Sequence, residues 1–154
     1  MGSSGTVSIG SPGPVMLQSL VEGVRIVVTE QALTDAEWEE QIRIALDWVP
    51  QTSGVIVVTD GPGLTSKQRS MYAKHRSLLA QPTAIISSSA IVRGIVTAMS
   101  WLGGKHLAFS PLKMDLAFDF LGVPPATRVR VLREIEVMQG KLRTAMPGGV
   151  GRVG

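Results

Sequence analysis

A turn rich in glycine carries small hydroxyl side chains in the stretch VIVVTDGPGLTSKQR. Its apolar first half is typical of a buried strand, and the chain then passes through Asp60, Gly61 and Gly63 to Thr65 and Ser66. Backbone amides at such a strand–helix junction can bind phosphate, as they do in a nucleotide P-loop. The Gly-Lys-Ser/Thr ending of a P-loop is absent here, so the sequence argues against ATP binding by this route.

Thr65 and Ser66 have two interpretations. Thr65 and Gln68 match a capping box, in which side chains satisfy free amide groups at the start of a helix. Ser66 would then lie exposed in the first helical turn, where the helix dipole stabilises a phosphate group. Both residues are therefore candidate phosphoacceptors, although a purely structural cap is the favoured interpretation.

A second hydroxyl cluster, Ser87 to Ser89, begins another expected helix and is followed by Arg93. Loops at the carboxyl ends of neighbouring parallel strands converge, and ligands favour that edge of a sheet. We therefore expect both clusters to form one surface for a partner or ligand. The alternative is that the serines only cap the helix and that Arg93 pairs with a carboxylate. The residues assigned to this surface are Asp60, Gly61, Gly63, Lys67, Arg69, Ser88, Ser89 and Arg93.

The sequence contains no combination of residues typical of an enzyme. Asp60, Ser66 and His75 would suggest a hydrolytic triad, but Ser66 and His75 are about 13 Å apart along the axis of one expected helix. His75 and His106 lack metal-ligating companions at the usual spacings, and the chain contains no cysteine. We therefore expect no catalytic residue, no metal and no cofactor.

Strand and helix patterns alternate along the chain. Two short runs rich in β-branched residues around Glu22 and Gly23 predict an opening hairpin at 15–20 and 24–29. Helices are expected in LTDAEWEEQIRIALDWV, at 65–80, in SSAIVRGIVTAMSWLGG and after Ser110-Pro111, and further strands in VIVVT, PTAIIS and KHLAF. This alternation predicts an α/β domain with a mixed, mostly parallel sheet of about five strands and four packing helices.

The order of these elements resembles a STAS domain, the fold of bacterial anti-sigma-factor antagonists, and most of all its SpoIIAA-like group. The stretches that carry the resemblance are LTDAEWEEQIRIALDWV, VIVVTDGPGLTSKQR, AIISSSAIVRGIVTAMSWLGG and LAFSPLKMDLAFDFLGV. Together they cover residues 15–123, which we expect to form the domain.

The resemblance implies a non-enzymatic regulatory module that binds another protein, such as a kinase-like regulator. In the antagonist family a kinase phosphorylates a serine at the start of the second helix, in a motif that is usually Asp-Ser-Ser-Gly. The matching positions here are Thr65 and Ser66. Members of the superfamily also resemble the Sec14 lipid carriers, so a small apolar ligand or lipid beneath the second and third helices is the alternative. A self-assembling scaffold is a third use of the fold.

The segment after Pro124 lies outside the resemblance and carries the net positive charge of the chain. The chain has a formal net charge of +3, and its Lys and Arg residues are concentrated after residue 125. A nucleic-acid-binding body is therefore not expected. Residues 124–145 predict a basic amphipathic helix that either packs on the domain or pairs with a copy of itself. The candidate pairing residues are Leu132, Ile135, Met138 and Leu142.

The composition of the chain limits the number of domains and the possible location of the protein. Apolar residues make up 44% of the 154 residues, which suits one globular domain with a substantial core. No apolar run reaches the ~18–20 residues of a membrane span. Residues 1–14 lack the pattern of a secretory signal and are expected to be a flexible leader, with a disordered tail at 146–154. These features favour the cytoplasm.

Overall fold

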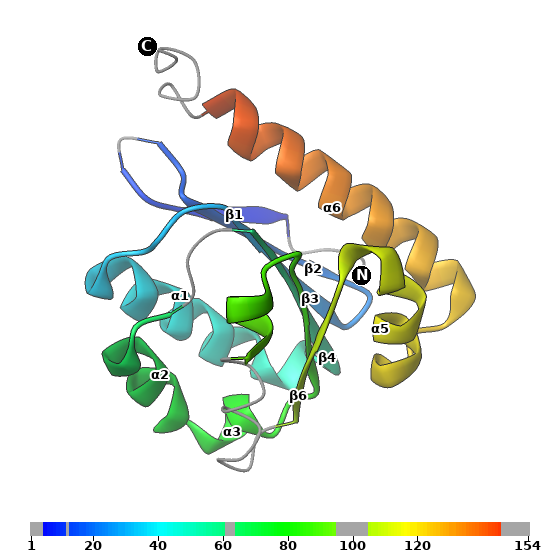
Figure 1. Cartoon of the computed structure of the whole chain (residues 1–154), viewed down its shortest axis with the longest axis horizontal. Helices are drawn as coiled ribbons and strands as arrows, with labels where there is room; N and C mark the ends of the chain where they lie inside the picture. Colours follow the sequence, from blue (N-terminus) through cyan, green and yellow to red (C-terminus); the bar gives the residue numbers. More distant parts are fainter. Residues whose placement is uncertain (1–4, 12, 61–63, 95–104, 146–154) are drawn as a thin grey trace.

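A six-stranded mixed sheet forms the centre of the structure, a computed structural model that describes residues 5–11, 13–60, 64–94 and 105–145. Helices cover both faces of this sheet (Figure 1). The strands are β1 (Thr6–Ile9), β2 (Met16–Val21), β3 (Val24–Thr29), β4 (Gly54–Thr59), β5 (Thr83–Ile86) and β6 (His106–Phe109). The helices are α1 (Asp35–Trp48), α2 (Ser66–Ala73), α3 (Arg76–Leu79), α5 (Met114–Leu121) and α6 (Pro125–Ala145), with short 3₁₀ turns at Val49–Gln51 and Pro111–Lys113. The α/β class and the mixed sheet agree with the sequence-based expectation.

The opening hairpin forms as predicted. Strands β2 and β3 pair antiparallel, with Val21 opposite Val24 across a two-residue turn. Both turn residues have positive φ, 48° at Glu22 and 88° at Gly23, which is the geometry of a type I′ hairpin. The backbone twist of this turn matches the twist of the strands that it joins.

The sheet has one strand more than expected. Thr6–Ile9, which the sequence placed in a flexible leader, forms β1 and pairs antiparallel with β2. Four residues between glycines and serines are too short a run to be recognised from periodicity alone. Their stability as a strand comes from pairing with β2 and from burial of Ile9 against the α1 side of the sheet.

The parallel half of the sheet determines where the connecting helices lie. Strands β3, β4, β5 and β6 pair in sequence order, each parallel to the one before. Right-handed crossovers then place every connecting helix on the same face. Figure 1 shows α1, α2 and α3 together on that face. The capping box predicted at the start of α1 is present, with Thr34 and Glu37 bonding reciprocally.

The single helix expected at 65–80 is divided into α2 and α3. His75 has extended backbone angles, φ −105° and ψ 94°, and interrupts the helix. Tyr72 and Leu78 are six positions apart and would point about 120° away from each other in a continuous helix. The break lets both side chains enter the same apolar cluster.

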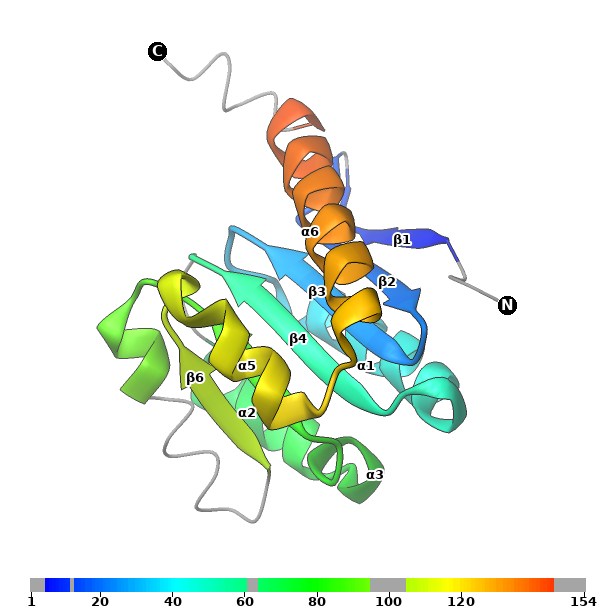
Figure 2. The ribbon, with the colours of Figure 1, turned by 90° about the vertical axis from the view of Figure 1, so that its right-hand side faces the viewer.

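Helices α5 and α6 cover the opposite face of the sheet. Figure 2 shows α6 lying across this face beside α5, and α6 contacts β2 and β3 while α5 contacts β5 and β6. Gly122 ends α5 in the left-handed conformation, φ 69°, where glycine is the favoured residue. The start of α6 is fixed to the hairpin turn, because Thr127 Oγ1 donates a 2.7 Å hydrogen bond to Glu22 and Arg130 pairs with the same carboxylate.

The packing of α6 corrects the expectation that it pairs with another copy. Ile135, Met138 and Leu142 are buried in the core of their own chain, and of the four candidate residues only Leu132 is exposed. Pairing through the three buried residues would require α6 to leave the sheet. The alternative prediction, that this helix packs back on the domain, is confirmed.

The third expected helix lies only partly within the described residues. A helical segment occupies 90–94, and the positions from 95 to 104 lie outside the described part of the chain. Among the described helices, none is both long enough and apolar enough to cross a membrane.

We expect Met138→Ala to destabilise the fold much more than Val137→Ala. Met138 is 0% exposed within the core, whereas its neighbour Val137 is 44% exposed on the outer side of α6. Removing a buried Met side chain costs about 2–5 kcal/mol, and a surface change costs about 0.5 kcal/mol or less. Urea unfolding of the two variants measures the difference. Equal free energies of unfolding would show that α6 does not pack on the sheet in solution.

Candidate functional site

The start of α2 is built around the capping box predicted from the sequence. Thr65 Oγ1 accepts a 3.1 Å hydrogen bond from the amide of Gln68, and the Gln68 side chain accepts a 3.2 Å bond from the amide of Thr65. Ser66 is the first residue of α2, is exposed, and accepts a 3.1 Å bond from Arg69 Nη2. The structural cap at Thr65 is therefore present, and phosphorylation at either hydroxyl stays a prediction.

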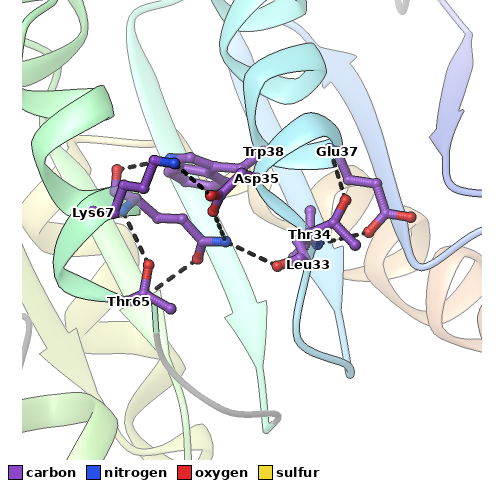
Figure 3. A network of polar contacts seen from close by, with 8 residues as sticks. Leu33, Thr34, Asp35, Glu37, Trp38, Thr65 and Lys67 are labelled. Atoms are coloured by element: carbon purple, nitrogen blue, oxygen red, sulfur yellow. Dashed lines mark hydrogen bonds and ion pairs between the residues drawn. The ribbon is translucent and has the colours of Figure 1, made fainter.

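The buried Gln68 joins the starts of α1 and α2, a role that the sequence analysis missed. Its Nε2 donates to the carbonyl of Leu33 at 2.8 Å and to Asp35 at 3.2 Å. The backbone carbonyl of Gln68 accepts a 2.8 Å hydrogen bond from the indole nitrogen of Trp38. Figure 3 shows Thr65, the N-cap of α2, and Lys67 of that helix facing Leu33, Asp35 and Trp38. A glutamine three residues after a cap indicates the capping box, but only the fold reveals the contacts to α1.

Lys67, which was assigned to a partner surface, forms an ion pair with the first residue of α1. Its amino group lies 3.0 Å from Asp35, and the hydrogen bond from Lys67, followed by that from Gln68, lowers the pKa of the Asp35 carboxyl. Both side chains are largely exposed, so this pair contributes little to stability. It leaves Lys67 near the predicted surface but oriented toward its own chain.

The loops after β4 and β5 meet as the sequence analysis expected. Asp60 Oδ1 accepts hydrogen bonds from the Ser88 hydroxyl at 2.9 Å and from the Ser88 amide at 3.2 Å. Ser89 caps the helical segment at 90–94 through a 3.2 Å bond from the amide of Val92. Gly61 and Gly63, assigned to the same surface, lie outside the described residues.

Two arginines of this edge bind backbone carbonyls. Arg69 Nη1 donates to the carbonyl of Leu64 at 2.7 Å, and Arg93 Nη1 donates to that of Ser87 at 2.9 Å. Both guanidinium groups therefore hold their own loops in place. Whether this edge binds a partner stays a prediction.

Below this edge, a cavity of about 110 Å³ lies between the sheet and helices α1 and α2. Leu64 lines it from the loop after β4, and Val92 lines it from the helical segment at 90–94. Trp38 and Gln41 line it from α1, and Tyr72 lines it from α2. The cavity therefore adjoins the predicted surface, although none of the described residues assigned to that surface lines it.

The deepest row of the cavity floor contains most of its polar side chains. Arg25 of β3 lies opposite Val55, Val55 opposite Thr83, and Thr83 opposite His106. All four residues line the cavity and all are buried. They belong to the amino-terminal ends of their strands, so this row is the end farthest from the two loops.

The rows nearer the loops are apolar and then hydroxylic. Val27, Val57 and Ile85 form the next row, and Thr29 and Thr59 follow at the carboxyl ends of β3 and β4. Val57 and Thr59 are half-buried, in contrast to the deep row. The cavity thus has a buried polar end, an apolar middle and a more accessible end at the loops.

Arg25 is the most unusual residue of the deep row, because it is a charged side chain that is only 1% exposed. Its Nη1 donates a 2.9 Å hydrogen bond to Gln18, and its Nε has no hydrogen-bond partner among the described residues. Burial lowers the pKa of the guanidinium, and interaction with the Tyr72 phenol opposes that shift. Arginine keeps its proton even when buried, so the deep end of the cavity carries a positive charge.

Tyr72 connects Arg25 with His106. Burial raises the pKa of the Tyr72 phenol, and Arg25 opposes this rise, so the phenol is neutral at pH 7. The rings of Tyr72 and His106 meet edge to face with centroids 6.0 Å apart. Arg25, Tyr72 and His106 therefore form one group of side chains, which we call the buried polar cluster.

His106 is held in its neutral form. It is 3% exposed, and neither ring nitrogen has a hydrogen-bond partner among the described residues. Burial lowers the pKa of the imidazole, which favours the uncharged ring. A neutral imidazole offers one donor and one acceptor to the cavity.

The sequence contained a signal for Arg25 that the analysis did not use. Arg25 alternates with Ile26 and Val28 in VRIVVT, so it points to the face opposite those residues. A strand expected between two helical layers has no exposed face. A charged residue inside such a strand is therefore expected to be buried and to need a partner.

Comparisons with protein-family models, curated proteins and solved structures find no match for this chain. The STAS resemblance therefore stays a prediction. Among the described residues, no group of three or more His, Asp or Glu side chains is placed to hold a metal ion. The described site contains a buried cation, neutral hydrogen-bonding groups and an apolar wall.

We expect the stability of the wild type to fall more steeply between pH 6.5 and 5 than that of His106→Gln. The pKa of His106 is lower in the folded than in the unfolded chain, where it is about 6.5. The unfolded chain therefore binds the extra proton first, so stability present above pH 6.5 is lost as pH falls toward the folded pKa. One such group contributes a slope of at most about 1.4 kcal/mol per pH unit. Urea unfolding at several pH values measures both slopes, and parallel slopes would contradict a buried neutral His106.

Proposed function

We propose that the protein is a non-enzymatic binding module whose cavity takes a small, largely apolar ligand. The cavity between the sheet and α1 and α2 is the observation that carries this proposal. It opens toward the carboxyl ends of the parallel strands, the edge at which open α/β sheets bind ligands. This function is the alternative that the sequence analysis placed beside a protein-binding role.

The residue types of the cavity support an apolar ligand. Val27, Val57 and Ile85 supply the middle of the floor, and Trp38 supplies an aromatic wall. A cavity of about 110 Å³ is close in size to engineered cavities of about 150 Å³ that bind benzene. The described cavity therefore suits a single ring or a short chain better than a two-chain lipid.

A second proposed function is regulatory binding of a protein at the mouth of the cavity, by which we mean the edge formed by the loops after β4 and β5. The STAS resemblance implies this function. Ile91 favours it, because this large apolar side chain is 78% exposed in the helical segment that follows Ser88 and Ser89. Exposed apolar side chains with polar neighbours are typical of protein contact sites. Thr65 and Ser66, on the neighbouring loop, are the proposed phosphoacceptors of this surface.

We expect Val57→Phe to weaken binding of benzyl alcohol, a neutral aromatic probe, by at least about tenfold. The added ring would occupy the middle of the cavity, so the probe loses its contact area. Isothermal titration calorimetry measures the affinity. Val137→Phe, the same change on an exposed position of α6, is the matched control and should bind like the wild type. If the wild type binds neither this probe nor benzoate at millimolar concentration, the proposed function is wrong.

We expect Ile91→Ser to remove a specific partner that co-purifies with the wild type from its native host. The substitution removes the apolar contact while leaving the capping bonds of Ser89 in place. Val137→Ser, which changes an exposed apolar residue on the far helix, should retain the partner. Mass spectrometry of the co-purified proteins measures the outcome, and identical partners for all three proteins would contradict a protein-binding mouth.

A further inference from the structure

Resting on the proposed binding function, we propose that the ligand of the cavity carries a carboxylate and that Arg25 binds it. The first support is the charge balance of the deep end. None of the ion pairs among the described residues includes Arg25. Its polar partners, the Gln18 amide and the Tyr72 phenol, are neutral at pH 7, so they solvate the charge without balancing it.

A buried charge without a counter-ion is costly for a protein. Removing a cation from water costs several kcal/mol after relaxation, and neutral hydrogen-bond partners recover only part of this. An anion bound in the cavity would supply the missing charge. Unsatisfied buried groups in a native structure are concentrated where ligands bind.

The geometry of Arg25 fits the planar fork of a carboxylate. Gln18 accepts a hydrogen bond from Nη1 and the Tyr72 hydroxyl is also hydrogen-bonded to the guanidinium, whereas Nε has no partner among the described residues. A carboxylate characteristically binds two guanidinium nitrogens in parallel, which gives both strength and orientation. Arg25 lines the cavity with its Nε buried, so a carboxylate would reach this nitrogen once the neighbouring side chains move aside.

The amount of charge favours a carboxylate over a phosphate. Among the described residues that line the cavity, Arg25 is the sole Lys or Arg. One carboxylate balances one guanidinium, whereas a phosphate group near −2 would leave a negative charge buried. His106 is held neutral and adds no second positive charge.

The order of the rows determines how such a ligand would lie. The carboxylate would reach the deep row at Arg25, and the hydrocarbon part would contact Val27, Val57 and Ile85 above it. The volume of about 110 Å³ fits one ring or a short chain. The ligand class is therefore a small aromatic or short-chain monocarboxylic acid.

The test compares benzoate and hexanoate with benzyl alcohol and hexanol, by calorimetry at pH 7.5. We expect the wild type to bind each acid at least about tenfold more tightly than its alcohol, because a charge-assisted pair adds to the same apolar contact. In Arg25→Met, which keeps a long apolar side chain, the acids should lose at least about tenfold in affinity and the alcohols should change less than about threefold. Arg43→Met, at an exposed position of α1, is the matched control and should bind like the wild type.

The outcomes separate the two proposals. If acids and alcohols bind the wild type equally and Arg25→Met changes neither, Arg25 does not bind a carboxylate, while the apolar binding function stands. If neither the acids nor the alcohols bind, the binding function itself is wrong. If the acids alone bind and Arg25→Met binds them as well as the wild type does, the assignment of Arg25 is overturned.

A measurement on the wild type alone covers the case in which Arg25→Met does not fold. Between pH 7.5 and 6.5, benzoic acid remains almost fully ionised, because its carboxyl pKa is about 4. Binding of the anion by Arg25 predicts nearly the same affinity at both pH values. Binding of the neutral acid by an apolar cavity predicts an apparent affinity about tenfold higher at pH 6.5. The second result would overturn the proposal.

Discussion

The order of the strands limits where the helices can lie. From β3 to β6, each strand is parallel to the next one along the chain and pairs with it. Because such crossovers are almost always right-handed, the connecting helices fall on one face of the sheet. The opposite face, with Ile26, Ile56 and Ile86, is apolar and has to be covered by segments that follow β6. Helices α5 and α6 are therefore part of the core.

The same constraint produces the cavity on the other face. Gln68 joins the starts of α1 and α2 through its bonds to Leu33, Asp35 and Trp38, so the two helices form one frame above the sheet. The floor beneath this frame consists mostly of short side chains such as Val55 and Thr83. Because Gln68 holds α1 and α2 together, these helices do not approach the sheet closely enough to fill the space above its short side chains. The same strand order therefore accounts for the packing of α5 and α6 on one face of the sheet and for the cavity under α1 and α2 on the other.

Local signals in the sequence predicted the features that depend on few residues. The turn at Glu22 and Gly23, the capping boxes at Thr34 and Thr65, and the glycine stop at Gly122 all depend on residues close together in the chain. Strand β1 was missed because its stability comes from pairing with β2 and not from its own four residues. The sequence did not decide what the apolar face of α6 packs against, because a heptad-like spacing of apolar residues is compatible with packing on a sheet and with packing on a second helix.

The candidate site was predicted only at its mouth. Asp60 and Ser88 could be placed together because both follow parallel strands at one edge. The deep row could not be found in this way. Arg25 and His106 are far apart in sequence, and only the register of four strands places them in the same row of the sheet. Spacing along the chain carries no information on that register, which depends on the lengths of the loops and on the packing of both faces.

Arg25 differs from the other core residues because folding alone does not explain its charge. A long apolar residue could fill the same space between Gln18 and Tyr72 without the cost of removing a cation from water. The Gln18 amide and the Tyr72 phenol reduce this cost, since they bind the guanidinium while remaining neutral. They also leave its charge and its Nε unmatched among the described residues. A charge retained at a stability cost, at the closed end of an apolar cavity, is best explained by the anion that it can bind there.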